Sequence, residues 1–135
     1  MGLQRLETRA MSISFTRLGD RAPISLDPDG AFRTGGKRHL GALLVSPGGA
    51  YDWSSAGAGF DETGLLGFLN REDAYRCDLL LLGRGPKSLL LPSSFTGEVE
   101  RLGLGLEAMN TAAACRTYNI LLAENRYFFA ALLPI

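Results

Sequence analysis

The sequence is poor in the residues from which metal centres and catalytic sites are usually built. It contains one histidine, His39, and two cysteines, Cys77 and Cys115. The cysteines are far apart and show neither a metal-ligand spacing nor the pattern of a disulfide framework, which fits a reducing compartment. We therefore expect no bound metal, no cofactor and a cytoplasmic location.

Long apolar runs and an excess of one charge are also missing. Fourteen basic residues balance fourteen acidic ones, so no net field favours nucleic acid or an anionic membrane surface. No apolar run approaches the roughly 20 residues that span a bilayer. Residues 1–11 contain arginine but lack the apolar segment of a secretory signal. We expect a soluble protein that neither binds nucleic acid nor is integral to a membrane.

The composition that remains is typical of a single folded domain. With 46% hydrophobic residues in a chain of 135, one shared hydrophobic core is expected. Residues 1–12 are predicted to form a flexible tail and residues 13–135 the domain. Short apolar segments and turn signals over about residues 13–55 predict antiparallel β structure. Residues 60–135 instead show alternating β and α patterns.

The first half of the domain is predicted to contain short strands joined by tight turns. Asp27-Pro28-Asp29-Gly30 is a strong turn signal and predicts a hairpin. Asp61 is expected to cap a helix that follows a loop of small residues over Ser54 to Gly59. The predicted strands are Ile13 to Phe15, Pro23 to Leu26, Ala31 to Arg33, Leu40 to Val45, and the segment with Tyr51 and Trp53.

The last third of the chain, Asp78 to Pro134, predicts three strands separated by two helices. Its apolar runs lack polar alternation, which is typical of strands covered on both faces. Strand–helix–strand units pair their strands in parallel, so an α/β fold is expected. The strands are predicted over Asp78 to Leu82, Leu104 to Met109 and Tyr127 to Leu133. The helices are predicted over residues 93–101, begun by a Ser93 or Ser94 hydroxyl, and 112–123, begun by Asn110 or Thr111.

Two segments should meet at the carboxyl edge of these strands, where open α/β sheets bind ligands. One is the loop from Gly83 to Lys87, and the other is the helix start at Thr111, whose N–H groups favour an anion. The competing interpretation is a tight strand exit with solvated arginines, because Gly-x-Gly alone is a weak signal. The candidate ligand- or anion-binding residues are Gly83, Arg84, Gly85, Thr111 and Arg116.

The sequence presents no complete catalytic set. Cys115 lies one turn into its helix, where the dipole and Arg116 would lower the pKa of a thiol. A nucleophile also needs a base, and nothing ties His39, in the antiparallel half, to this helix. We favour buried core thiols for Cys115 and Cys77. The sequence therefore favours a non-catalytic protein and leaves an enzyme at the candidate crevice as the alternative.

The segment Glu107-Ala-Met-Asn-Thr-Ala-Ala-Ala-Cys-Arg-Thr-Tyr-Asn-Ile-Leu, together with Gly83-Arg84-Gly85, carries a family resemblance. Over roughly Ile24 to Pro134, the chain resembles the small α/β domain family that includes mitochondrial NADH dehydrogenase (complex I) assembly factor 3 and uncharacterised bacterial proteins. The resemblance implies a three-layer β/β/α arrangement around a mixed, largely parallel sheet. The recurring residues are Thr111, Ala114, Tyr118 and Asn119.

Two functional hypotheses follow from the residues and the resemblance. The resemblance implies a non-catalytic interaction protein that helps to build the peripheral arm of complex I, with NADH dehydrogenase subunits as partners. Such a protein should expose an apolar or aromatic patch. The alternative is a small-molecule or anion-binding domain that uses the Gly83–Thr111 crevice.

Asn119 is expected to bond backbone groups inside the fold. Self-association through an exposed sheet edge stays open.

Overall fold

The computed structural model describes residues 15–53, 60–85 and 90–135. The predicted flexible tail, most of the strand predicted before Thr16, the loop of small residues and the basic residue Lys87 lie outside the described residues. In the described part, the elements are β1 (Arg17–Gly19), β2 (Ile24–Leu26), β3 (Phe32–Thr34), β4 (Lys37–His39), β5 (Leu43–Ser46), β6 (Gly49–Asp52), α2 (Glu62–Arg71), the 3₁₀ turn η2 (Asp73–Tyr75), β7 (Leu79–Gly83), α3 (Ser93–Arg101), β8 (Gly105–Met109), α4 (Thr111–Ala123) and β9 (Phe129–Leu132).

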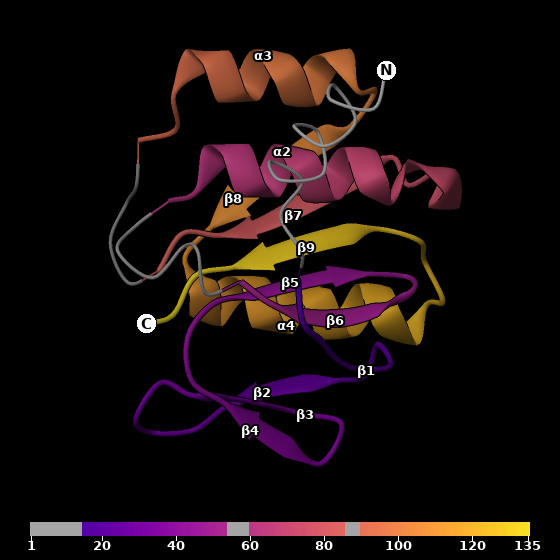
Figure 1. Ribbon diagram of the computed structural model, residues 1–135. Helices are drawn as coiled ribbons and strands as arrows, with labels where there is room; N and C mark the ends of the chain where they lie inside the picture. The colour runs from indigo at the N-terminus through magenta and orange to yellow at the C-terminus, as the bar shows by residue number, and fades with distance from the viewer. Residues whose placement is uncertain (1–14, 54–59, 86–89) are drawn as a thin grey trace, which may run out of the picture.

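The elements form three layers around a six-stranded sheet (Figure 1). Helices α2 and α3 cover one face, and α4 lies on the other face beside the three-stranded sheet of β2, β3 and β4. Successive side chains of a strand point to opposite faces. Leu80 and Leu82 of β7 accordingly pack in the cluster with α2 and α3, while Leu81 packs in the cluster with α4. The central strands are therefore buried on both sides, as their uninterrupted apolar runs predict.

The large sheet has the order β1-β6-β5-β9-β7-β8 and is mixed. Strand β7 pairs in parallel with β8 and with β9, whereas β5 pairs antiparallel with β6 and β9, and β1 antiparallel with β6. This confirms the α/β fold with a mixed sheet. The parallel pairs are confined to the last third of the chain, where strands and helices alternate. Among the described residues, no helix is both long and apolar enough to cross a bilayer.

The first half follows the predicted hairpin but differs elsewhere. Strands β2 and β3 pair antiparallel around the expected turn. Leu40, predicted to be in a strand, is 67% exposed and precedes β5. The predicted serine cap of α3 is wrong: Pro92 is the N-cap without a side-chain hydrogen bond, and the Ser94 hydroxyl donates to Glu62. Strand β1 and strand β4 were not predicted.

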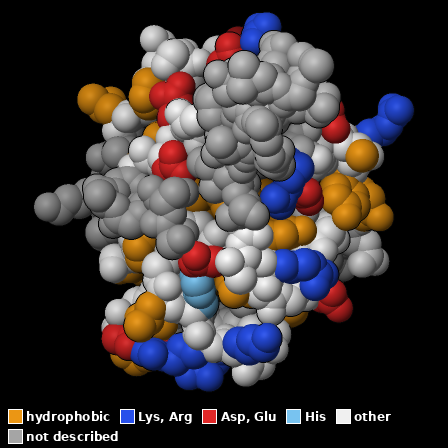
Figure 2. All heavy atoms as spheres, viewed as in Figure 1, with side chains coloured by type: hydrophobic (Ala, Val, Ile, Leu, Met, Phe, Trp, Pro, Cys, Tyr) orange, Lys and Arg blue, Asp and Glu red, His pale blue; other side chains and the backbone are white. Residues whose placement is uncertain are grey.

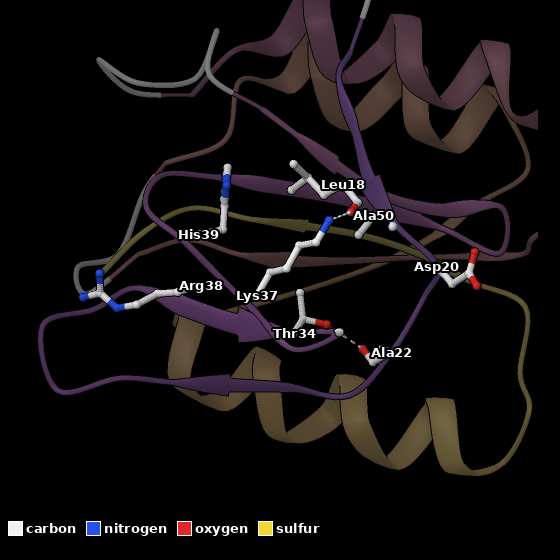
Figure 3. Close-up of a pocket in the computed structure, with 10 residues that line it drawn as sticks. Leu18, Asp20, Ala22, Thr34, Lys37, Arg38, His39 and Ala50 are labelled. Carbon is white, nitrogen blue, oxygen red and sulfur yellow. Dashed lines mark hydrogen bonds between the residues drawn. The ribbon is translucent and has the colours of Figure 1, made fainter.

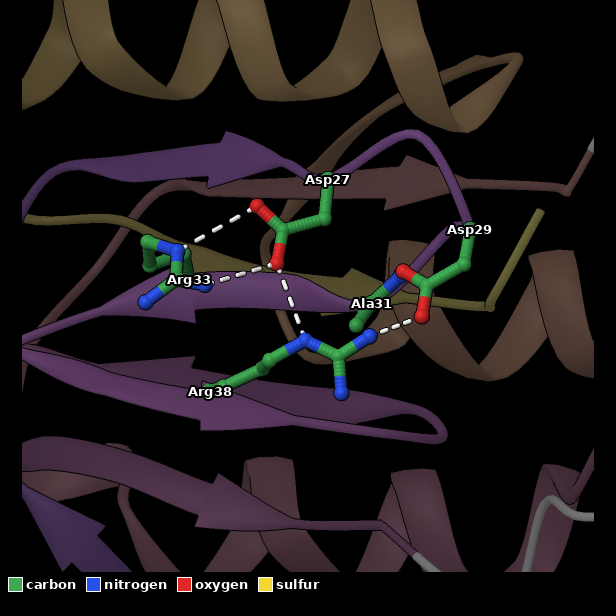
Figure 4. A network of polar contacts seen from close by, with 5 residues as sticks. All are labelled: Asp27, Asp29, Ala31, Arg33 and Arg38. Carbon is green, nitrogen blue, oxygen red and sulfur yellow. Dashed lines mark hydrogen bonds and ion pairs between the residues drawn. The ribbon is translucent and has the colours of Figure 1, made fainter.

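A network of charged side chains holds the β2–β3 turn against β4 (Figure 4). The Asp27 carboxylate accepts two hydrogen bonds from Arg33, at 3.2 and 3.0 Å, and one from Arg38 at 2.9 Å. Arg38 also pairs with Asp29. Hydrogen bonds from Arg33 and then Arg38 lower the pKa of Asp27. The guanidinium of Arg38 is thus engaged on the outer face of this small sheet.

Candidate functional site

The structure brings the glycine loop and the start of α4 together through Thr111. The Thr111 side chain is buried, and its hydroxyl accepts a hydrogen bond from the Gly85 N–H at 2.8 Å. The same hydroxyl donates to the Leu133 carbonyl at 2.7 Å, just after β9. The Thr111 N–H donates to the Gly85 carbonyl at 3.2 Å. Thr111 therefore joins α4 to the ends of β7 and β9, in a unit that we call the threonine junction: Gly83, Gly85, Thr111 and Leu133.

Close packing and backbone conformation explain why the threonine junction contains two glycines. A β-carbon at Gly83 would lie 3.0 Å from the Thr111 hydroxyl oxygen and 3.1 Å from its α-carbon. Gly85 has a φ of +87°, in the left-handed region that L side chains rarely adopt. Close approach and backbone conformation therefore account for the Gly-x-Gly pattern without a ligand.

The two arginines of the candidate set are placed differently. Arg84 is half-buried, and its backbone N–H donates a hydrogen bond to the Met109 carbonyl at 2.8 Å. Arg116 is exposed on α4 and, within the described part of the chain, forms no hydrogen bond or ion pair. At the helix start, the Asn110 side chain accepts from the Ala113 N–H at 2.8 Å. The N–H groups of Gly85, Thr111 and Ala113 are thus engaged inside the protein, whereas the Arg116 guanidinium is not, and the ligand-binding role of this set stays a prediction.

The other recurring residues of α4 connect the helix to the segment that leads into β2. The Asn119 side chain accepts from the Ile24 N–H at 2.9 Å and donates to the Ile24 carbonyl at 2.8 Å. Tyr118 is buried and donates from its hydroxyl to the Ala22 carbonyl at 3.0 Å. Ala114 is fully buried in the same cluster. The expectation that Asn119 bonds backbone groups inside the fold is confirmed.

Both cysteines have the properties of buried thiols. Cys115 is 5% exposed in the core beneath α4, and Cys77 is half-buried. Burial raises the pKa of each thiol to about 11, and the nearby Arg116 offsets this only in part at Cys115. Near neutral pH both residues are thiols rather than nucleophilic thiolates. The predicted core role is confirmed for Cys115, whereas Cys77 is only partly buried and packs against the edge of the core.

Stability is expected to fall as the pH rises from about 9 through about 11, because each raised thiol pKa favours the neutral form in the folded state. This contribution to the free energy of unfolding is fully present below the pKa that a thiol has in the unfolded chain. It is lost as the pH rises through the higher pKa of the folded state. Urea unfolding at about pH 8 and about pH 10.5 measures the loss. The double variant Cys77→Ala, Cys115→Ala should show a shallower decline. An identical decline in both proteins would contradict the assignment.

A pocket of about 370 Å³ lies between the edge strand β1 of the large sheet and β4 of the small one (Figure 3). The Lys37 ammonium crosses from β4 and donates to the Leu18 carbonyl at 3.2 Å. The His39 imidazole Nε2 lies 3.1 Å from an Asp52 carboxylate oxygen. The pocket is lined by Leu18, Gly19, Asp20, Ala22, Thr34, Gly35, Lys37, Arg38, His39 and Ala50.

The amino-acid sequence does not reveal this pocket, because it carries little signal for β4. Lys37-Arg38-His39 has none of the β-branched or aromatic residues that indicate a strand. The available signal was Gly35-Gly36, since two glycines with positive φ, here +59° and +77°, form a two-residue hairpin turn.

Two exposed tyrosines form the second surface feature. Tyr127 is 57% exposed and Tyr75 is 37% exposed, and their ring centroids lie 6.4 Å apart. The guanidinium of Arg21 lies 5.8 Å from the centre of the Tyr127 ring. A β-carbon at Gly48 would collide with the Tyr75 hydroxyl, so this ring rests against the β5–β6 turn. We call Tyr75, Tyr127 and Arg21 the tyrosine patch.

The fold and the threonine junction define a small α/β domain, and its family follows from comparison with known proteins. Residues 27–133 match the family described as "Protein of unknown function (DUF498/DUF598)", so the chain belongs to that family. An uncharacterised protein of Rhodobacter capsulatus is 42% identical over 113 residues, covering 84% of this chain and 85% of the relative. The family suggested by the segment around Thr111 is confirmed.

The relatives include NADH dehydrogenase assembly factors. Human NADH dehydrogenase [ubiquinone] 1 alpha subcomplex assembly factor 3 is 28% identical over 111 residues, which are 76% of this chain and 55% of the human protein. The chain thus spans about half the length of that relative.

Solved structures share the fold. A Bartonella henselae structure described as an outer membrane protein has a TM-score of 0.70 and 31% identity, covering 86% of this chain and 97% of that one. A Bordetella pertussis protein described as a Mth938-like domain has a TM-score of 0.68 and 28% identity, covering 84% and 85%. The chain therefore has a Mth938-like fold.

Proposed function

We propose that this protein acts without catalysis, as an interaction protein resembling a complex I assembly factor. Its partners in this proposal are NADH dehydrogenase subunits. The kinship with an assembly factor of the human respiratory complex supports the role, although this chain matches only about half of that protein. Thr111, Tyr118 and Asn119 also support it, because each donates a hydrogen bond to the backbone of the protein itself. The recurrence of these residues in the family is then explained by a shared fold and does not require a shared reaction.

The tyrosine patch is the observation that carries the proposal. Tyrosine and arginine are enriched where protein interfaces concentrate their binding energy, because each offers a large apolar surface and a polar end. Tyr75 rests on the β5–β6 turn and Tyr127 lies beside Arg21, so the rings lose little freedom on binding. An exposed aromatic patch is what the interaction hypothesis requires.

Affinity purification of the tagged protein from the organism that naturally produces it, followed by mass spectrometry, tests the proposal. NADH dehydrogenase subunits should be enriched with the wild type and reduced at least about tenfold with Tyr75→Ala, Tyr127→Ala, since loss of two central aromatic contacts costs more than 1 kcal/mol each. Ile120→Ala is the matched control, because it removes a 61% exposed apolar side chain from α4. Equal recovery with the tyrosine variant, or no enrichment with the wild type, would overturn the proposal.

A further inference from the structure

The pocket between β1 and β4 has the size and walls of a small-molecule site. Its volume of about 370 Å³ lies within the roughly 300–1,000 Å³ of ligand pockets. Leu18 of β1, Ala22 and Ala50 of β6 give it an apolar wall, and Thr34 and Lys37 face it from the small sheet. These two belong to one cross-strand pair of the β3–β4 hairpin. The pocket shares no residue with the tyrosine patch or with the threonine junction.

Lys37 differs from the other charged groups around the pocket. Arg38 pairs with Asp27 and Asp29, and Asp20 pairs with Arg17 at 2.8 Å. The ammonium of Lys37 donates only to a neutral carbonyl, and among the described residues it meets no carboxylate within ion-pair distance. Figure 3 shows its chain extending across the pocket toward Leu18 and Ala50, while the Arg38 side chain points away.

The charged side chains around Lys37 are preformed, since Arg38 and His39 each lie against acidic partners. The His39 Nε2 lies 3.1 Å from Asp52 Oδ1 and 3.2 Å from the Ala42 carbonyl oxygen. Both neighbours are acceptors, so Nε2 carries the hydrogen and the ring is held in one orientation. Figure 2 shows Lys and Arg side chains gathered over the end of the molecule formed by β2, β3 and β4, with the histidine next to them. An anion approaching this face meets a cation that no described acid neutralises.

We propose that this pocket binds a small monocarboxylate with an apolar body. The carboxylate pairs with the Lys37 ammonium, and the apolar part lies against Leu18, Ala22 and Ala50. A phosphate group fits less well, because phosphate sites use several charge-assisted donors or a helix N-terminus. Of the basic side chains that line this pocket, Arg38 is paired with Asp27 and Asp29, and His39 lies against Asp52, which leaves the Lys37 ammonium. A neutral apolar molecule would leave the Lys37 ammonium with only the neutral Leu18 carbonyl as its partner.

Titration of the full ¹⁵N-labelled chain with hexanoate, followed by amide chemical shifts, tests the inference. Saturable shifts are expected at Thr34, Gly35, Lys37 and Ala50. Hexanamide, which has a chain of the same length without the charge, and inorganic phosphate should each bind at least about tenfold more weakly, a difference of about 1.4 kcal/mol.

Two charge variants assign the binding to Lys37. Lys37→Gln, at an exposed side chain, should weaken hexanoate binding at least about tenfold, and Lys37→Arg should retain most of it. Arg101→Gln is the control, because it removes one exposed positive charge from the end of α3, outside every candidate site, and should leave the affinity unchanged. The inference is overturned by the absence of saturable shifts, by equal binding of phosphate or hexanamide, by an unchanged affinity in Lys37→Gln, or by shifts centred on Thr111. The tyrosine variant should bind hexanoate normally, so this test fails or succeeds independently of the assembly role.

Discussion

Replacement of Thr111 by valine is expected to lower the free energy of unfolding by about 2–6 kcal/mol. Valine keeps the shape and volume of the side chain but has no hydroxyl. The Gly85 N–H and the Leu133 carbonyl would then both lose their partner in a buried environment. Each unsatisfied buried group costs about 1–3 kcal/mol, which gives the expected range.

Thr111→Ser is the matched control, because it keeps the hydroxyl and removes only a methyl group. Urea unfolding followed by circular dichroism should show a much smaller loss for serine than for valine. Equal losses in the two variants would mean that packing, and not the two hydrogen bonds, holds the threonine junction together.

Replacement of Tyr118 by alanine is expected to cost about 3–5 kcal/mol, the range for truncating a buried aromatic ring. Tyr118 is fully buried, and its ring packs edge-on against Phe128 with the centroids 5.4 Å apart. The variant would open a cavity between α4 and the sheet. It would also weaken the attachment of the segment that leads into β2.

Tyr118→Phe separates the ring from the hydroxyl. The Ala22 carbonyl also accepts a hydrogen bond from the Thr34 hydroxyl, at 3.2 Å, so it keeps a partner when the Tyr118 hydroxyl is removed. The loss should therefore be only about 0.5–1.5 kcal/mol. Thermal unfolding of the three proteins measures both effects. A phenylalanine variant as unstable as the alanine variant would contradict the predominance of ring packing.

The last third of the chain could be predicted because its local signals agree with its tertiary environment. The apolar run that forms β7 is covered on both faces, and Asn110 caps α4 as its side chain suggests. The start of α3 was predicted for the wrong reason, since Pro92 and not a serine hydroxyl occupies the N-cap. In this part of the chain the positions of strands and helices are thus encoded locally, whereas the residue that caps α3 is not.

The candidate sites were only partly predictable. Gly83, Gly85 and Thr111 could be recognised as a set, but the sequence does not tell that Thr111 bonds to the protein's own backbone. The pocket requires β1 and β4, which are short edge strands held in place by contacts with distant residues. The tyrosine patch joins Tyr75 and Tyr127, which only the folded chain places side by side. Apart from the Gly35-Gly36 turn before β4, these features arise from tertiary contacts between residues far apart in the sequence.

Deletion of the gene in its own host, followed by native gel analysis of the respiratory membranes, tests the assembly role most directly. If the protein assists assembly, the deletion strain should contain less complete NADH dehydrogenase and should accumulate unattached peripheral-arm subunits. The wild type and Ile120→Ala should restore the complex, whereas Tyr75→Ala, Tyr127→Ala should not, although it folds normally. A full complement of NADH dehydrogenase in the deletion strain, or full rescue by the tyrosine variant, would contradict the account.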